Sequence, residues 1–159
     1  MSIEIERTLV FLSKPKEVLL GYKKRGHGAG LWNGIGGKVE TGESTETAMI
    51  RECQEEVGVT PEDYRKIARL VFKGGSDKTQ PINNVTAYLC DKWLGEPTET
   101  EEMQPRWFRL LDVPYDQMWS GDEIWLPMAL SGGYFEGVVE FDPNNKVKNW
   151  QLDQVKKDP

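Results

Sequence analysis

The chain has 159 residues, of which 38% are hydrophobic and 29% are charged, a composition that is ordinary for a globular protein. Its formal net charge of −6 argues against non-specific binding to long nucleic acid, which requires a basic surface. It contains no run of about 18 apolar residues and no charged leader before an apolar segment, so we expect neither a membrane span nor a secretory signal.

The length suits one domain spanning residues 1–159, long enough to bury a core. The two cysteines, Cys53 and Cys90, are too few for a disulfide framework. We therefore expect a protein of the reducing cytoplasm that acts as a monomer.

The first part of the chain predicts two strands followed by a glycine-rich loop. The strands are expected over residues 3–12 and 17–22, on either side of a turn at Lys14-Pro15. The loop extends from Arg25 to Gly37 and leads into a helix.

This helix should begin after Ser44 and end near Val57. Ser44 follows a Gly-Glu turn and can cap the helix, and Gly58 supplies a left-handed stop. The apolar side chains of the segment fall on one arc and should face a core. They are Met49, Ile50, Cys53 and Val57.

The remaining strands are expected in five short segments separated by turns rich in Gly, Pro and Asn. These segments are 67–72, 84–89, 106–110, 134–141 and 147–152. A glycine turn at 74–77 separates the first two, and a second helix over 122–130 should begin at the Ser120-Gly121-Asp122 turn. Strands with two helices packed against them favour an α/β fold of the α/β/α sandwich type.

Three glutamates share one face of the first predicted helix. Glu52, Glu55 and Glu56 are spaced i, i+3, i+4 and occupy an arc of about 100°. Their mutual repulsion would be relieved by Mg²⁺, which prefers oxygen ligands and keeps waters and substrate phosphates in its shell. Arg51, four residues before Glu55, can hold one carboxylate in place. An isolated E-x-x-E-E would ordinarily be a solvated face, but the surrounding residues favour a metal site.

Residues 37–59 fit the pattern Gly-x5-Glu-x7-Arg-Glu-U-x-Glu-Glu-x-Gly-U, where U is a bulky aliphatic residue. The matching residues are Gly37, Glu43, Arg51, Glu52, Glu55, Glu56 and Gly58, with Cys53 and Val59 at the U positions. This pattern resembles the signature of the Nudix hydrolases, which cleave nucleoside diphosphates linked to another group with the help of divalent cations. The resemblance implies the Nudix fold, an α/β/α sandwich with a mixed β-sheet, and Mg²⁺ as cofactor, with Mn²⁺ as a substitute.

Outside the signature, the segments 18–39, 101–108, 117–119 and 124–127 resemble the oxidised purine nucleoside triphosphatases, a branch of that family that cleans the nucleotide pool. By this resemblance, Asn33 and Asp122 would contact the purine edge and Trp119 would stack on the base. The same pocket would be lined by Thr8, Lys23, His27, Phe72 and Met103. From the residues alone, Trp119 could instead be a core residue, Asn33 a turn former and Asp122 the cap of the second helix.

Two positions depart from that branch. The branch has two adjacent aspartates after its Trp-Pro, whereas Trp119 is followed here by Ser120-Gly121-Asp122, so the first acid is missing. His27 stands where the branch has a phenylalanine. These departures bear on the preference for oxidised guanine more than on the hydrolase assignment.

The resemblance also implies a reaction, the release of pyrophosphate from a purine nucleoside triphosphate. The metal would be held by Glu52, Glu55, Glu56 and the Gly36 carbonyl, with Glu102 joining them when substrate binds. Arg51 is expected at the catalytic site, and either Glu52 or Glu102 would be the general base. Two alternatives stay open: a Nudix hydrolase of another diphosphate, such as ADP-ribose, and a nucleotide-sensing module without catalysis.

Overall fold

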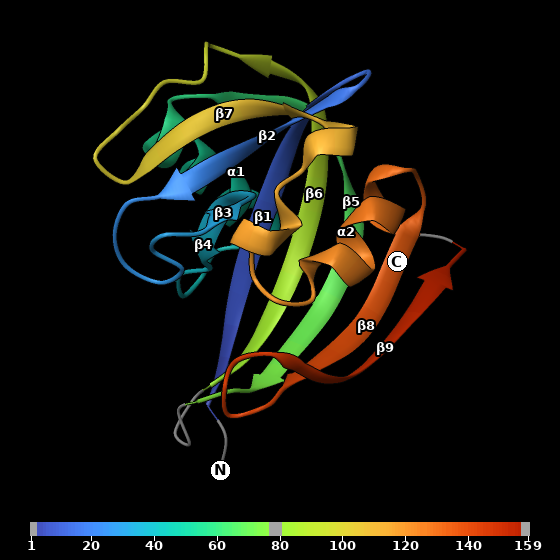
Figure 1. The fold of residues 1–159 in the computed structure, drawn as a ribbon. Helices are drawn as coiled ribbons and strands as arrows, with labels where there is room; N and C mark the ends of the chain where they lie inside the picture. The colour runs from blue at the N-terminus through green and yellow to red at the C-terminus, as the bar shows by residue number, and fades with distance from the viewer. Residues whose placement is uncertain (1–2, 77–80, 157–159) are drawn as a thin grey trace.

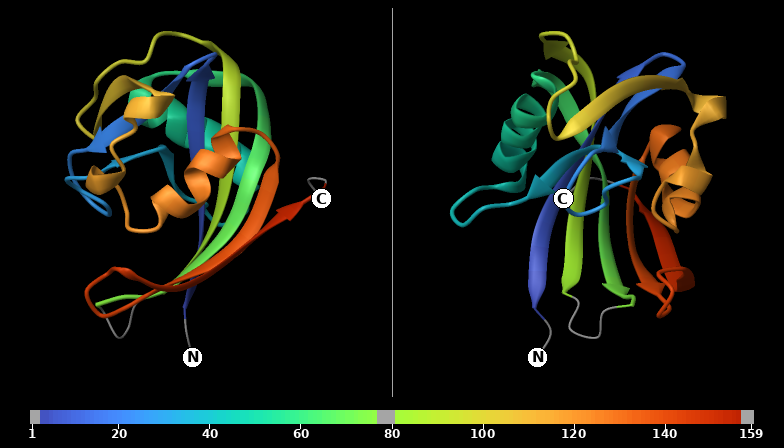
Figure 2. Two further views of the ribbon diagram at one scale, coloured as in Figure 1. Left: turned by 45° about the vertical axis from the view of Figure 1, so that its right-hand side comes forward. Right: turned by 60° about the vertical axis from the view of Figure 1, so that its left-hand side comes forward.

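The computed structural model describes residues 3–76 and 81–156, and within these residues nine strands form one sheet with a helix on each face (Figure 1, Figure 2). The strands are β1 (Glu4–Lys14), β2 (Glu17–Lys23), β3 (Trp32–Asn33), β4 (Ile35–Lys38), β5 (Thr60–Gly74), β6 (Ile82–Leu94), β7 (Met103–Arg109), β8 (Tyr134–Phe141) and β9 (Val147–Val155). The helices are α1 (Thr45–Val57) and α2 (Asp122–Leu130), and two short 3-10 turns, Leu110–Asp112 and Tyr115–Gln117, precede α2. The expected α/β/α sandwich is confirmed. No helix in the described ranges is long and apolar enough to cross a membrane.

The sheet is mixed, as expected. Its order is β3-β2-β1-β6-β5-β8-β9, with β4 paired to β1 and β7 paired to β2. β1 runs parallel to β6 and β5 runs parallel to β8, whereas the other pairs are antiparallel. Residues 7–10 of β1 pair with β4 on one side and with β6 on the other, so this part of β1 lies next to the glycine loop.

The helix α1 forms as its sequence predicts. The Ser44 hydroxyl accepts a hydrogen bond from the Thr47 backbone N–H, and Gly58 ends the helix with a φ of 73°. Met49, Cys53 and Val57 are fully buried against side chains of β1, β2 and β6. Ile50 is only partly buried at the edge of the same cluster.

The helix α2 packs on the opposite face of the sheet (Figure 2). Trp125 and Leu126 are buried there in a second cluster with Phe11, and the Trp125 and Phe11 rings meet edge to face at 6.1 Å between centroids. The cap of this helix is Gly121 rather than Asp122, so the interpretation of Asp122 as a helix cap is wrong. Asp122 is the first residue of the helix, and its carboxylate accepts a hydrogen bond from Trp125 instead.

Several elements extend beyond their predicted bounds. The segment expected to be a loop contains the short strands β3 and β4, because Gly36 lets β4 approach β1 so closely that a Cβ there would lie 1.8 Å from the Thr8 carbonyl oxygen. β5 and β6 are much longer than the predicted 67–72 and 84–89. Asp77, the last residue of the predicted glycine turn, lies outside the described residues.

Candidate active site

A pocket lies between the sheet, the loop before β3, the start of α2 and the turn between β8 and β9. All the side chains predicted to bind substrate line it, although they come from segments far apart in the sequence. These are Thr8, Lys23, His27, Asn33, Phe72, Met103, Trp119 and Asp122. The backbone of Gly36 and Gly37 forms another part of the wall. Contact of these residues with a substrate stays a prediction.

Two buried polar atoms in this pocket have no hydrogen-bond partner among the described residues. They are Thr8 Oγ1 and Asp122 Oδ2, and both residues are nearly inaccessible to solvent. The other Asp122 oxygen accepts a hydrogen bond of 3.1 Å from Trp125 Nε1. Because an unpaired buried polar group is costly, a polar ligand in the pocket would stabilise these atoms.

Burial raises the pKa of Asp122 to about 7, far above its ordinary value of 3.8. The carboxyl group is therefore partly protonated near neutral pH, so Oδ2 can either donate or accept a hydrogen bond. A purine edge presents both donors and acceptors, which suits this dual character.

The raised pKa predicts how stability depends on pH. Between about pH 4 and about pH 7 the folded chain holds a proton on Asp122 that the unfolded chain has lost, so the free energy of unfolding falls as pH rises. Asp122→Asn cannot ionise, and its stability relative to wild type should increase across this window by on the order of 1 kcal/mol for each pH unit. Urea unfolding of both proteins at about pH 5, 6, 7 and 8 measures the difference. Parallel curves would contradict the assignment, since other titrating groups cancel in this comparison.

His27 and Trp119 form one wall of the pocket. Their rings are stacked, with centroids 5.2 Å apart and an interplanar angle of 27°. The pKa of His27 is lowered to about 4, first by desolvation and then by the positive charges of Arg7, Lys23 and Lys38. His27 is therefore neutral at physiological pH and acts as an aromatic wall residue, and Trp119 belongs to the pocket rather than to the core.

The structure shows little space for an acidic side chain at position 121. Gly121 has a φ of 105°, and a Cβ at this position would lie 3.1 Å from Val147 Cγ2 and 3.4 Å from Val139 Cγ1. An aspartate therefore does not fit without a shift of the backbone or of β9.

We predict that Gly121→Asp lowers the free energy of unfolding by about 1–3 kcal/mol, because a strained φ and crowding against β8 and β9 add together. Gly132→Asp is the matched control: Gly132 has a φ of 122°, but a Cβ added there would have no atom within 4 Å. Urea denaturation of both variants separates the two contributions. An equal loss of unfolding free energy in the two variants would show that crowding at Gly121 contributes nothing.

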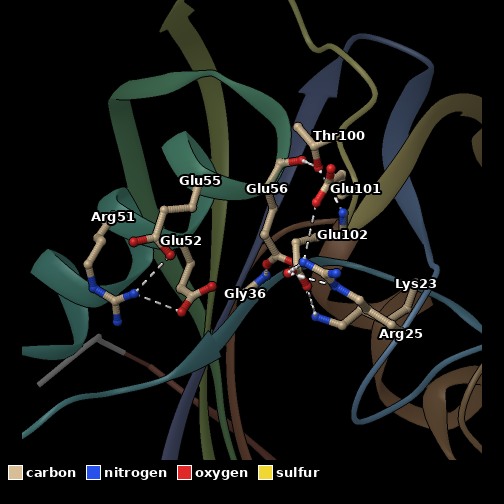
Figure 3. Close-up of polar contacts among 10 residues, drawn as sticks. All are labelled: Lys23, Arg25, Gly36, Arg51, Glu52, Glu55, Glu56, Thr100, Glu101 and Glu102. Carbon is tan, nitrogen blue, oxygen red and sulfur yellow. Dashed lines mark hydrogen bonds and ion pairs between the residues drawn. The ribbon is translucent and has the colours of Figure 1, made fainter.

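The carboxylates of α1 are next to the pocket wall, where Glu56 contacts Gly36 and Lys23 (Figure 3). Glu56 is buried, with Oε1 accepting a hydrogen bond of 3.0 Å from the Gly36 N–H and Oε2 lying 3.2 Å from Lys23 Nζ. Desolvation raises the pKa of Glu56 to about 7 against the opposing effect of Lys23. Glu56 therefore differs from an exposed carboxylate of the same helix face, because β4 and Lys23 cover it.

Arg51 organises the other carboxylates of the helix. Its Nη1 lies 2.8 Å from Glu52 Oε1 and 3.3 Å from Glu55 Oε2, so the predicted contact with Glu55 is present. Its stronger contact is a two-point hydrogen bond to Glu43, at 2.8 and 2.9 Å, which lowers the pKa of Glu43 to about 2. Arg51 therefore fixes the turn before α1 as well as Glu52.

Glu102 stands opposite α1, just before β7 (Figure 3). Its Oε1 accepts hydrogen bonds from Arg25 Nε and Nη2 at 3.0 and 2.6 Å, and its Oε2 lies 4.0 Å from Lys23 Nζ. The hydrogen bonds from Arg25 hold the pKa of Glu102 below its ordinary value. Thr100 ties this loop to the helix by donating a 2.8 Å hydrogen bond to the Glu56 carbonyl.

The carboxylate and carbonyl oxygens around α1 suit a hard divalent cation, although the carboxylates are paired with Lys and Arg side chains. Among the described residues, no three His, Cys, Asp or Glu side chains are arranged closely enough to hold a metal ion. Lys23, Arg25 and Arg51 instead neutralise the carboxylates. Carboxylate and carbonyl oxygens are the ligands that Mg²⁺ prefers, and Glu56 places a buried carboxylate beside the Gly36 backbone.

Comparison with known proteins decides the family. The family model of the NUDIX domain matches residues 5–129. The chain belongs to the Nudix family. It is 41% identical over 148 residues to an oxidized purine nucleoside triphosphate hydrolase of Danio rerio, a match that covers 93% of this chain and 94% of that protein. A protein of the same name from Mus musculus is 39% identical over 149 residues, with the same coverage of both.

Solved Nudix structures share the fold. A MutT protein from Bacillus halodurans superposes with a TM-score of 0.78 over 94% of this chain and 97% of that one, at 22% sequence identity. This likeness concerns the fold alone, and it agrees with the sandwich expected from the sequence.

Sequence reasoning missed several residues of this Nudix pocket. They are Arg7, Leu9, Asn83, Val85, Phe141 and Asn145. Arg7 and Leu9 flank Thr8 on β1. Knowing that the pocket lies where β1 meets β4 would therefore have suggested both residues. The others come from strands and a turn that contain no local signal for a site.

Proposed function

We propose that this Nudix protein hydrolyses oxidised or otherwise modified purine nucleoside triphosphates, such as 8-oxo-dGTP or 2-hydroxy-dATP, to monophosphate and pyrophosphate, and so cleans the nucleotide pool. One juxtaposition carries the proposal: the unpaired polar atoms of Thr8 and Asp122 line the same pocket as Gly36, whose N–H binds Glu56. The names of the relatives from Danio rerio and Mus musculus support this substrate class.

In this proposal the base lies against Trp119, whose stacking would contribute about 1–3 kcal/mol. Asp122 and Thr8 would pair with the purine edge. Asn33 would join them through its amide N–H groups, because its Oδ1 already accepts a 2.8 Å hydrogen bond from the Gly34 N–H. Lys23, His27, Phe72 and Met103 would complete the pocket.

The site would hold Mg²⁺, for which Mn²⁺ could substitute. The proposed ligands are Glu52, Glu55, Glu56, Glu102 and the Gly36 carbonyl. When bound, the cation would lower the pKa of the attacking water and neutralise charge on the phosphate oxygens.

The chain's own residues would position the reactants and move the proton. Glu52 or Glu102 would accept the proton of the attacking water. Lys23, which bridges Glu56 and Glu102, could donate to a phosphate oxygen. Arg51 would hold Glu52 in place.

Pyrophosphate release in the presence of Mg²⁺ tests the proposal. The substrates would be 8-oxo-dGTP, 2-hydroxy-dATP, O6-methyl-dGTP, dGTP, dATP and ADP-ribose at equal concentrations. We expect the oxidised or methylated purines to react at least about tenfold faster than dGTP, a difference that one or two selective hydrogen bonds provide. Equal rates for all triphosphates would remove the sanitising role. Faster ADP-ribose cleavage would indicate another Nudix activity, and binding without cleavage would indicate a sensing module.

We also propose that the chain acts as a monomer, as one domain over residues 1–159. A reducing compartment such as the cytoplasm suits its two cysteines, which are free and buried. Sedimentation analysis of the purified chain would check the monomer.

A further inference from the structure

Arg7 is a cation in the pocket wall to which the proposed reaction gives no role. It lies on β1 beside Thr8, it is partly buried, and its side chain lines the pocket. Its Nε donates a hydrogen bond of 2.8 Å to Asn83 Oδ1, which fixes the plane of the guanidinium. The remaining N–H groups, on Nη1 and Nη2, have no hydrogen bond to any described residue.

The charge of Arg7 is not neutralised in the way that other partly buried cations are. Lys23 contacts Glu56, Arg51 contacts Glu43, and Arg69 contacts Glu6, each within 3.2 Å. Within the described ranges, no carboxylate lies within 4.0 Å of the Arg7 guanidinium. Desolvation lowers the pKa of Arg7, and the more distant Glu52 only partly opposes this effect. The pocket wall therefore contains positive charge that a bound anion would stabilise.

Arg7 also lines both the main pocket and the hollow next to it. On one side it joins His27, Trp119, Asn83 and Asn145 in lining a hollow that continues the main pocket. On the other side it is close enough to Glu52 for their charges to interact. In the proposed function, a nucleotide with its base on Trp119 and its phosphates near Glu52 would extend along the wall that Arg7 lines.

We propose that Arg7 binds the phosphate chain of the nucleoside triphosphate through its Nη groups. The planar fork of a guanidinium matches two phosphate oxygens, and such charge-assisted pairs are stronger than bonds to neutral acceptors. Lys23 already has a carboxylate partner in Glu56, whereas Arg7 is a pocket-lining cation with no carboxylate within 4.0 Å among the described residues. This assignment rests on the proposed function and adds a residue that determines affinity for the phosphates rather than for the base.

Binding measurements without metal separate a phosphate contact from a base contact. Calorimetry in EDTA would compare 8-oxo-dGTP, 8-oxo-dGMP and 8-oxo-deoxyguanosine for wild type and Arg7→Met, which keeps the stem and removes the charge. We expect the variant to bind both nucleotides about 10- to 100-fold more weakly, and the nucleoside within about twofold of wild type. Arg7→Lys should recover part of the loss, because it restores the charge without the fork.

Two further variants test whether a loss of affinity in Arg7→Met comes from misfolding or from the change in net charge. Asn83→Asp leaves Arg7 in place but gives it a carboxylate partner, so the same phosphate-dependent loss is expected. Lys92→Met changes the charge equally on an exposed residue near the far end of β6 and should bind like wild type.

An equal loss of affinity for the nucleoside and the nucleotides would overturn the proposal in favour of a base contact. Unchanged binding in both Arg7→Met and Asn83→Asp would overturn it as well. Failure of the proposed function is distinct, because the wild-type chain itself would then neither bind nor hydrolyse these triphosphates.

Discussion

Replacing Glu56 with glutamine should lower the rate of pyrophosphate release by about 100-fold or more, while the chain stays folded. Glu56 is buried at the point where α1, β4 and Lys23 meet. The amide of Glu56→Gln can still accept the hydrogen bond from the Gly36 N–H, so the local backbone is retained. It lacks the negative charge that a divalent cation and Lys23 both require. Its Nε2 would also place a donor against the Lys23 ammonium.

Steady-state rates at increasing Mg²⁺ and Mn²⁺ concentrations would measure this effect. Glu62→Gln, an exposed residue on β5, is the control for the loss of one carboxylate and should retain wild-type rates. Glu55→Gln should fall between the two, because the Glu55 side chain is 58% exposed and its one ion pair within the described residues is with Arg51. Turnover of Glu56→Gln within a few-fold of wild type would show that Glu56 is not a metal ligand.

Trp125→Ala should lower the free energy of unfolding by about 3–5 kcal/mol, the largest loss of stability that we expect from a single change. Trp125 is 1% exposed and packs edge to face against Phe11. Its indole N–H is also the hydrogen-bond donor to Asp122 Oδ1. The variant therefore loses a large buried ring and leaves a buried carboxyl group with one partner fewer.

Trp125→Phe keeps a six-membered aromatic ring but removes the N–H together with the five-membered ring, so most of the packing is retained while the hydrogen bond is lost. We expect it to cost about 1–3 kcal/mol, the range for leaving a buried polar group unsatisfied. Trp150→Ala on β9 is the surface control, since Trp150 is 54% exposed, and it should change stability by less than about 0.5 kcal/mol. Guanidinium unfolding followed by far-UV circular dichroism would measure all three. If Trp125→Ala were no more destabilising than Trp150→Ala, the packing of α2 on the sheet would be incorrect.

The parts of the fold predicted well from sequence are those with local signals. Ser44, Gly58 and the apolar face of α1 lie within one short segment, so its boundaries were correct to the residue. The Nudix signature lies in the same segment, and the family match confirms the family. The strands around Lys14-Pro15 and the hairpin of β8 and β9 were also predicted, because turn residues bracket them.

The parts that were not predicted depend on contacts between distant segments. The burial of Glu56 results from the approach of Gly36 and Lys23, which a helical wheel of α1 does not contain. Arg7 and Asn83 are 76 residues apart in the sequence, and only the parallel pairing of β1 with β6 brings them together. The glycines at 36 and 37 were interpreted as loop formers, whereas they are glycines because a neighbouring strand or carboxylate occupies the space of a side chain.

The position of Gly36 restricts how this enzyme scaffold can acquire a new substrate. The same residue lines the pocket and donates its N–H to Glu56, and it has no room for a side chain, because a Cβ there would lie 1.8 Å from the Thr8 carbonyl oxygen. In the proposed function, the Gly36 peptide therefore contacts both the pocket for the base and the Glu56 carboxylate. A change in β4 would alter base selectivity and the position of Glu56 together. Asn145 and Gly28 line the pocket without a hydrogen bond to any glutamate in the described ranges. Libraries aimed at different nucleobases should therefore diversify the β8–β9 turn and the loop before β3, and leave β4 constant.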